Sequence, residues 1–134
     1  MKRVVSFSII GLLFLIFVTG CNEESLTGIK QINVGDIQER MALSAADQDG
    51  AVYIDVREQY EFDDAYIEGF TNFPLSTLEE TYNELPKEKE IIIICRSGNR
   101  SMQAGIILQE NGFENVTNVQ GAMLDWNGET KSNN

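Results

Sequence analysis

The sequence contains no histidine and only two cysteines, Cys21 and Cys95, among its 134 residues. Without histidine the chain cannot form a Cys-His protease, a Ser-His-Asp hydrolase or a histidine-ligated metal centre. If the Cys21 sulfur is lipidated, Cys95 is the single free thiol. That count excludes an internal disulfide and a Cys-x-x-Cys redox pair. Any cysteine chemistry in the folded domain therefore depends on Cys95.

The N-terminal residues have the layout of a secretory signal. Residues 1–3 (MKR) are basic, residues 4–18 are almost wholly apolar, and the letters TGC close the run with small residues. The apolar run is short for a helix that crosses a bilayer, which needs about 20 residues. We therefore expect residues 1–20 to be a signal peptide, with an uncleaved membrane anchor as the alternative.

The end of this leader, VTGC, resembles the bacterial lipobox, in which cleavage falls before a cysteine whose sulfur carries diacylglycerol. The resemblance implies cleavage before Cys21 and a membrane partner through a lipid anchor on that residue. Two or more acyl chains hold a protein stably on a membrane. We therefore expect a lipoprotein on the outer face of the cytoplasmic membrane or in the periplasm. Residues 21–32 would be the lipid anchor and a flexible tether.

Acidic residues outnumber basic ones along the chain. Loss of Lys2 and Arg3 with the leader leaves 8 basic residues against 21 acidic ones, a net charge of −13. Nucleic acid binding needs basic patches that release counterions, so this charge argues against a nucleic acid partner. It argues equally against attachment to anionic lipid by charge, and it favours solubility outside the cell.

Short apolar runs of strand length alternate with segments of helical pattern along the rest of the chain. The predicted strands, in chain order, lie within residues 31–34, 51–56, 69–75, 90–95 and 113–121. Strands that alternate with helices form a parallel sheet covered on both faces, and the isoleucine run fits its central strand. The sequence therefore predicts an α/β fold with a parallel sheet.

The predicted helices occupy the segments between these strands. The helix within residues 76–85 opens with a capping-box pattern, Ser76 or Thr77 followed three residues later by glutamate, and it stops before Pro86. The helix after the isoleucine run ends near Gly112. Residues 47–50 (DQDG) are a turn signal.

The stretch CRSGNRS, residues 95–101, gives the strongest indication of function. Cys95 falls at the carboxyl end of a predicted parallel strand, where ligands bind in open α/β sheets. A tight turn from strand to helix gathers backbone N–H groups into an anion-binding nest, and the helix start adds further unsatisfied donors. Gly98 relieves the steric limit of such a loop, while Arg96 and Arg100 add positive charge.

These surroundings favour the thiolate form of a cysteine. We therefore expect Cys95 to attack sulfur without a histidine base, and the loop to hold the persulfide anion that results. Ser97, Asn99 and Ser101 complete the predicted loop, although the two serines can instead cap the helix. An inert core residue is the alternative for Cys95, and a solvated charge is the alternative for an arginine, above all Arg96.

Three motifs, taken together in their order along the chain, resemble a single-domain rhodanese. CRSGNRS resembles the active-site loop of that family, and YIDVREQYEF resembles its strand-and-turn motif. GFENVTNVQGAMLDW resembles its C-terminal Gly-Phe, strand, Gly and Trp pattern. The resemblance implies a rhodanese-like fold with a central five-stranded parallel sheet and helices on both faces. We place that domain at residues 33–131, followed by a polar tail at 132–134.

By this resemblance the chain is a sulfurtransferase. It would move sulfane sulfur from a thiosulfate-like donor, through a persulfide on Cys95, to a thiophilic acceptor, with no cofactor or metal. Its partners would be a small sulfur-containing anion and, as an open alternative, a protein that accepts sulfur. Asp55 and Arg57 are implied to lie beside the loop and orient it. Ordinary roles stay open for both, a turn cap for Asp55 and an ion pair with Glu58 or Glu61 for Arg57.

The chain departs from the family pattern at residues 65–69, where AYIEG replaces a common Gly-His-Ile-Pro-Gly; this change bears on substrate preference. One rival function is a persulfide carrier or interaction module without turnover. Another is a cysteine phosphatase or arsenate reductase on the same fold. Phosphatase loops of that class place five residues between cysteine and arginine, whereas four separate Cys95 from Arg100, and the domain has no resolving cysteine.

Overall fold

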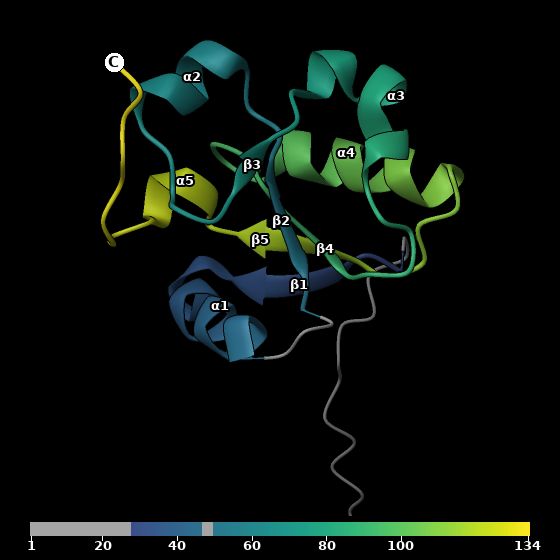
Figure 1. Cartoon of the computed structure of the whole chain (residues 1–134), viewed down its shortest axis with the longest axis horizontal. Coiled ribbons are helices and arrows are strands. Elements are labelled where there is room, and N and C mark those ends of the chain that lie inside the picture. The colour runs from purple at the N-terminus through teal and green to yellow at the C-terminus, as the bar shows by residue number, and fades with distance from the viewer. Residues whose placement is uncertain (1–27, 47–49) are drawn as a thin grey trace, which may run out of the picture.

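The computed structural model describes residues 28–46 and 50–134 (Figure 1). Its strands form one five-stranded sheet in the order β1-β5-β4-β2-β3, and every pairing is parallel. The predicted α/β fold is therefore confirmed. The strands are β1 Lys30–Asn33, β2 Val52–Asp55, β3 Thr71–Asn72, β4 Ile91–Ile94 and β5 Val116–Gln120.

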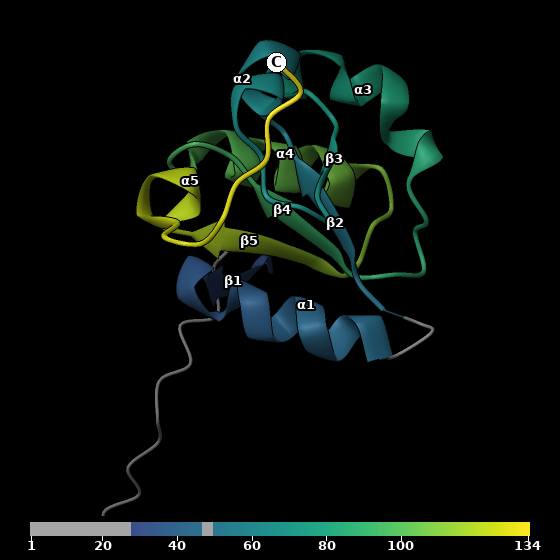
Figure 2. The ribbon, with the colours of Figure 1, turned by 60° about the vertical axis from the view of Figure 1, so that its left-hand side comes forward.

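Helices cover both faces of this sheet, as predicted. Figures 1 and 2 show α1 against one face and α3 and α4 against the other. The α-helices are α1 Ile37–Ala46, α2 Gln59–Asp64, α3 Leu78–Thr81, α4 Asn99–Glu110 and α5 Ala122–Asp125. Three 3-10 turns, η1 Val34–Asp36, η2 Leu75–Thr77 and η3 Tyr82–Glu84, flank α1 and α3.

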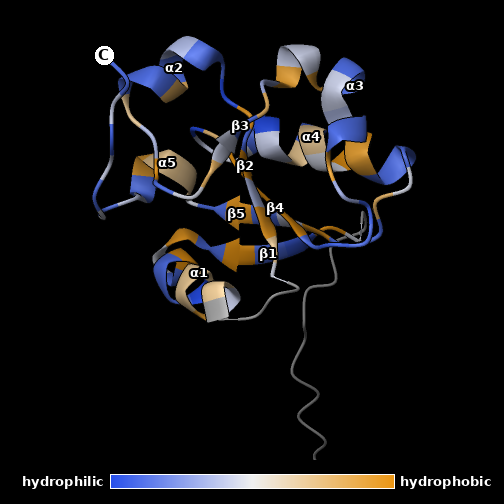
Figure 3. Cartoon of the chain, in the orientation of Figure 1, coloured by the Kyte–Doolittle hydropathy of each residue, from blue (hydrophilic) through white to orange (hydrophobic). Residues whose placement is uncertain are grey.

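The four isoleucines of β4 are completely buried and divide between two cores. Ile91 and Ile93 join the core under α3 and α4, whereas Ile92 and Ile94 join the core on the face of α1, α2 and α5. This division follows from the alternation of side chains along a strand. Figure 3 shows apolar residues gathered along the central strands. Burial of each such side chain contributes roughly 1.5–3 kcal/mol.

The capping box predicted at Ser76 or Thr77 is wrong. Thr77 is the residue before α3, but it makes no side-chain cap, and its hydroxyl donates to the Pro74 carbonyl at 3.4 Å. The 3-10 turn η2 leads directly into α3, so backbone bonds such as Thr77 N–H to Pro74 O, at 3.0 Å, already occupy this entry. A capping-box arrangement occurs instead at α2, where the Glu61 carboxylate accepts the Glu58 N–H at 3.0 Å.

The chain after α5 returns along α2. Tyr66 and Lys131 exchange two backbone hydrogen bonds, at 2.9 and 2.8 Å, and the Asn133 N–H donates to the Asp63 carbonyl at 2.8 Å. The segment predicted as a polar tail thus contacts the domain.

The predicted signal peptide and the lipidated Cys21 lie outside the described residues, as does most of the DQDG turn. Within residues 28–46 and 50–134, no helix combines the length and apolar character that a membrane span requires.

Candidate active site

Cys95 directly follows β4, at the carboxyl end of the sheet, where the chain turns into α4. Gly98 ends this turn with φ of 107°, in the region that favours glycine. A Cβ there would meet no atom within 4 Å, so the requirement for glycine is conformational. This backbone geometry directs the Gly98 N–H to the Cys95 Sγ at 3.0 Å. The loop therefore closes on the thiol, as the sequence predicts.

The start of α4 supplies further donors beside Cys95. Because the helix begins at Asn99, the N–H groups of its first three residues have no partner within the helix. Gly98, the residue before it, has no side chain to cap them. Unpartnered N–H groups and the positive end of the helix dipole both favour negative charge at this position.

Ser101 links Cys95 to β5. Its Oγ lies 3.3 Å from the Cys95 Sγ, 2.9 Å from the Gly98 carbonyl and 2.5 Å from the Asn118 Oδ1. The Asn118 Nδ2 in turn donates to the Gln31 Oε1 of β1 at 2.7 Å. Ser101 and Asn118 are 0% and 4% exposed, so the part of this network next to Cys95 is buried, whereas Gln31 is exposed.

Cys95 itself is 0% exposed and packs in the core with Ile93 and Leu108. A thiol at the mouth of the sheet, which the motif suggests, is therefore not what the structure shows. The Sγ nevertheless contacts the Gly98 N–H and the Ser101 hydroxyl, so its surroundings are not wholly apolar. A substrate must displace part of this cover before it reaches the sulfur.

The two loop arginines have different environments. Arg96 is exposed, whereas Arg100 forms two hydrogen bonds with the Glu61 carboxylate, at 2.6 and 2.9 Å. The hydrogen bond from Arg100 lowers the pKa of Glu61 to about 2, although burial acts in the opposite direction. The same bond raises the pKa of Arg100, and the nearby Cys95 adds a smaller contribution of the same sign. The positive charge expected beside the thiol is thus largely neutralised by Glu61.

Asp55 and Arg57 pair with each other. The Arg57 Nη2 donates to Asp55 Oδ2 at 2.6 Å, and both side chains are buried. Asp55 also accepts the Arg57 N–H at 3.0 Å, which is the turn-capping role considered above. Arg57 further donates to the carbonyls of Glu61, at 3.3 Å, and Ala65, at 2.7 Å. It pairs with neither Glu58 nor Glu61 through their carboxylates; it braces α2, whose Glu61 then holds Arg100.

Helix α5 holds the backbone of Cys95 itself. The N–H groups of Met123 and Leu124 donate to the carbonyls of Cys95 and Arg96, both at 3.0 Å. Gly121 and Ala122 precede these donors with φ of 80° and 53°. A positive φ is uncommon for alanine, so the turn into α5 carries backbone strain where it meets the loop.

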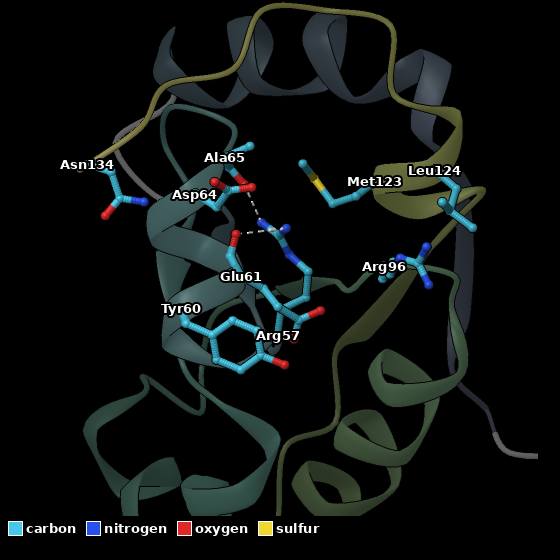
Figure 4. A pocket seen from close by; sticks show the side chains of 9 residues that line it. All are labelled: Arg57, Tyr60, Glu61, Asp64, Ala65, Arg96, Met123, Leu124 and Asn134. Carbon is cyan, nitrogen blue, oxygen red and sulfur yellow. Dashed lines mark hydrogen bonds between the residues drawn. The ribbon is translucent and has the colours of Figure 1, made fainter.

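A pocket of about 490 Å³ opens between α2, the residue after Cys95, and α5 (Figure 4). Two apolar side chains on it are well exposed, Tyr60 at 74% and Leu124 at 60%. Cys95 does not line this pocket. Its lining residues are Arg57, Tyr60, Glu61, Asp64, Ala65, Arg96, Met123, Leu124 and Asn134.

The structure brings together most residues that the sequence singles out and adds several that it does not. Glu61, Asn118 and Gln31 belong to the site through their hydrogen bonds to Arg100, Ser101 and each other. A signal existed for Asn118, because an amide within the buried strand VTNVQ needs an internal partner. No sequence pattern indicates the bonds from α5, since they depend on tertiary packing.

The family model described as "Rhodanese-like domain" matches residues 39–129. The chain belongs to the rhodanese-like family. This rhodanese-like domain is 38% identical to the "Putative sulfurtransferase YtwF" of Bacillus subtilis (strain 168), over 79% of this chain and 98% of YtwF. It is 36% identical to the "Putative sulfur carrier protein YrkF" of the same organism, over 82% of this chain. The chain spans only 57% of the length of YrkF.

A solved structure agrees with this assignment. The rhodanese-like domain protein from Staphylococcus aureus superposes with a TM-score of 0.68 at 25% identity, over 78% of this chain and 98% of that protein. The resemblance to rhodanese found in the sequence motifs is therefore confirmed, and the relatives carry the names of sulfurtransferases and sulfur carriers.

Proposed function

We propose that this domain is a sulfurtransferase in which Cys95 carries sulfane sulfur as a persulfide. One observation carries the proposal: the Sγ accepts the Gly98 N–H beside the unpartnered N–H groups that begin α4. A backbone donor at the sulfur, next to a helix start with free N–H groups, suits an anion bound there. The sulfurtransferase and sulfur-carrier names of the relatives support the same chemistry.

The first step is an attack of the Cys95 thiolate on the outer sulfur of a thiosulfate-like donor. A bond forms between Sγ and that sulfur, the donor's S–S bond breaks, and its electron pair leaves with sulfite. The product is a persulfide whose negative charge lies on the outer sulfur, which the N–H groups at the start of α4 would stabilise. No proton moves in this step, so the chemistry needs no histidine base.

In the second step a nucleophilic acceptor attacks the outer sulfur. The bond between that sulfur and Sγ breaks, its electron pair returns to Cys95, and the thiolate is restored.

Two features of the structure and its relatives bear on the identity of the acceptor. The 490 Å³ pocket falls in the range of small-molecule sites, and its exposed Tyr60 and Leu124 offer apolar contact. These exposed side chains, and a relative named as a sulfur carrier, favour a protein acceptor as the second candidate.

The direct test is to incubate the protein with thiosulfate and measure the mass of the peptide that contains Cys95. We expect a gain of one sulfur atom, followed by thiocyanate release and return to the original mass when cyanide is added. A persulfide that cyanide cannot discharge would favour the carrier function. Hydrolysis of an aryl phosphate without any persulfide would instead favour the phosphatase.

The matched variant is Cys95→Ser, which replaces one buried atom and keeps the side-chain volume close. It should lose both the mass gain and thiocyanate formation while the circular dichroism spectrum and the unfolding midpoint stay near those of the parent. Transfer activity that survives in this variant would contradict the assignment of Cys95.

We further propose that Cys21 is lipidated and tethers the domain on the outer side of the cytoplasmic membrane or in the periplasm. The support is the lipobox-like VTGC and the basic and apolar leader before it. Labelling of cells with a palmitate analogue should tag the wild-type chain and not a Cys21→Ser variant. Equal labelling of both chains would refute the anchor.

A further inference from the structure

Ser101 has one hydroxyl proton and three acceptors around it. The Asn118 Oδ1 lies at 2.5 Å, the Gly98 carbonyl at 2.9 Å and the Cys95 Sγ at 3.3 Å. A hydroxyl donates one hydrogen bond at a time and can accept two. The short distance places the proton towards Asn118, so the Ser101 oxygen presents lone pairs to the sulfur.

Gln31 fixes the direction in which Asn118 points its oxygen. The Asn118 Nδ2 donates to the Gln31 Oε1 at 2.7 Å, and this leaves Oδ1 directed at Ser101. The two residues are direct partners in the pairing of β1 with β5. The neutral side of the site, which we define as Gln31, Ser101 and Asn118, is thus a chain of hydrogen bonds that ends at the sulfur.

The consequence for Cys95 depends on where negative charge lies. An empty thiolate carries its charge on Sγ and would gain from a Ser101 hydrogen bond. A thiol can donate to the Ser101 oxygen, and in a persulfide the charge lies on the outer sulfur, so Sγ needs no second donor. An arrangement that directs the Ser101 proton to Asn118 therefore disfavours only the empty thiolate.

We propose that Asn118, oriented by Gln31, is a positioning residue that keeps the Ser101 proton away from Cys95 and so favours the persulfide over the empty thiolate. The part of this inference that concerns the persulfide rests on the proposed sulfurtransferase function. Such a bias makes the thiolate a stronger nucleophile and holds the sulfur on Cys95 until an acceptor arrives.

Charged groups near Cys95 come from several elements, and the test keeps all of them unchanged. β5 contributes none, since its sequence is VTNVQ, and the glutamates of α3, at 79 and 80, are exposed. The groups that remain are Arg96 in the loop, Arg100 of α4 with Glu61 and the nearby Glu58, and the buried pair of Asp55 and Arg57 after β2. Asp125 of α5 is exposed.

The test measures the rate at which iodoacetamide modifies the Cys95 peptide of the full chain as a function of pH. Asn118→Val removes the acceptor that holds the Ser101 proton. A charged sulfur then attracts this proton more strongly than the Gly98 carbonyl does, because that carbonyl already accepts the Met102 N–H at 3.2 Å. We expect the alkylation midpoint to fall by about one pH unit, the size of one hydrogen bond gained by a charged group. Gln31→Leu, on the exposed side of β1, should shift it in the same direction by less.

The control is Thr117→Val, a change on the same strand, whose side chain bonds to Glu90 instead. It should leave the midpoint in place. In a Ser101→Ala background Asn118→Val should have no effect, because the proton that it releases is missing. An unchanged or raised midpoint in Asn118→Val, or the same fall without Ser101, would overturn the proposal. If Asn118→Val does not fold, an unchanged alkylation midpoint in Gln31→Leu would overturn the proposal.

A second readout tests the persulfide directly. Sulfite reverses loading from thiosulfate, so the ratio of thiosulfate to sulfite at half loading measures the stability of the persulfide. At a pH above the alkylation midpoints of both proteins, we expect Asn118→Val to need a ratio about tenfold higher than the parent, since one pH unit corresponds to a factor of ten. If the parent does not load at all, the proposed function fails at its donor, while the alkylation series still decides the arrangement of the Ser101 proton.

Discussion

Cys95 lies between two polar environments that stabilise the site in different ways. The charged side consists of Asp55, Arg57, Glu61 and Arg100, and every one of these charges is paired with an opposite one. The neutral side, defined above, carries no formal charge and ends at the sulfur. The comparison teaches that Arg100 of the loop motif is held in an ion pair within the frame of the site, whereas the direct polar contacts of the sulfur are the Gly98 N–H and the Ser101 hydroxyl.

The largest effect is expected where the charged side is most buried. Asp55→Ala leaves the Arg57 guanidinium, 7% exposed, without its carboxylate. Removing one partner of a buried ion pair costs about 3–5 kcal/mol, because the remaining charge stays desolvated. Urea unfolding should show a loss of that order. The double variant Asp55→Ala, Arg57→Met should lose less than Asp55→Ala alone, and a single-variant loss below about 1 kcal/mol would contradict the frame role.

A smaller effect follows from the paired Glu61. Its pKa in the folded chain is about 2, below its ordinary 4.5, so the unfolded chain binds the proton more readily. The stabilisation from this ion pair is therefore complete above the ordinary pKa of 4.5. It is lost as the pH falls through the folded-state pKa of about 2. Between about pH 6 and pH 3, the parent should lose more unfolding free energy than Glu61→Gln, which has no proton to bind. Equal losses would show that the pair does not contribute to folding.

The smallest expected effect is on the alkylation midpoint of Cys95, where the charged side and the neutral side can be compared directly. Arg100→Ala leaves the Glu61 carboxylate unneutralised and should raise the alkylation midpoint of Cys95 by up to about one pH unit. Glu61→Gln should lower it, because Arg100 is then unpaired. Arg96→Ala, which removes an exposed charge, should shift it less than Arg100→Ala. If neither Arg100→Ala nor Glu61→Gln moves the midpoint while Asn118→Val does, the charged side acts on structure alone.

Much of the fold and the loop could be predicted because local patterns determine them. The isoleucine run requires a strand buried on both faces, and Gly98 after Cys95 requires the tight turn that the structure shows. The capping box at Thr77 failed because a preceding 3-10 turn had already supplied the backbone partners. Local pattern alone cannot show which of two competing caps a helix uses.

The parts of the site that could not be predicted depend on contacts distant in sequence. Arg100 meets Glu61 across 39 positions, and Asn118 meets Gln31 across 87. The complete burial of Cys95 likewise results from packing between α4 and the sheet, which the motif does not encode. Residue types in a motif indicate a candidate chemistry, while the fold decides which charges are neutralised.

The strand order has a consequence for how the domain is made. β1 pairs only with β5 within the described sheet, and β5 follows Cys95 in the chain. During synthesis from the N-terminus, the first strand therefore has no paired neighbour until residues 116–120 have been produced. Such long-range pairing is slow to form and keeps apolar surface exposed meanwhile. Because α5 also emerges after β5, the backbone around the sulfur obtains its final geometry only after residues 122–125 have been made.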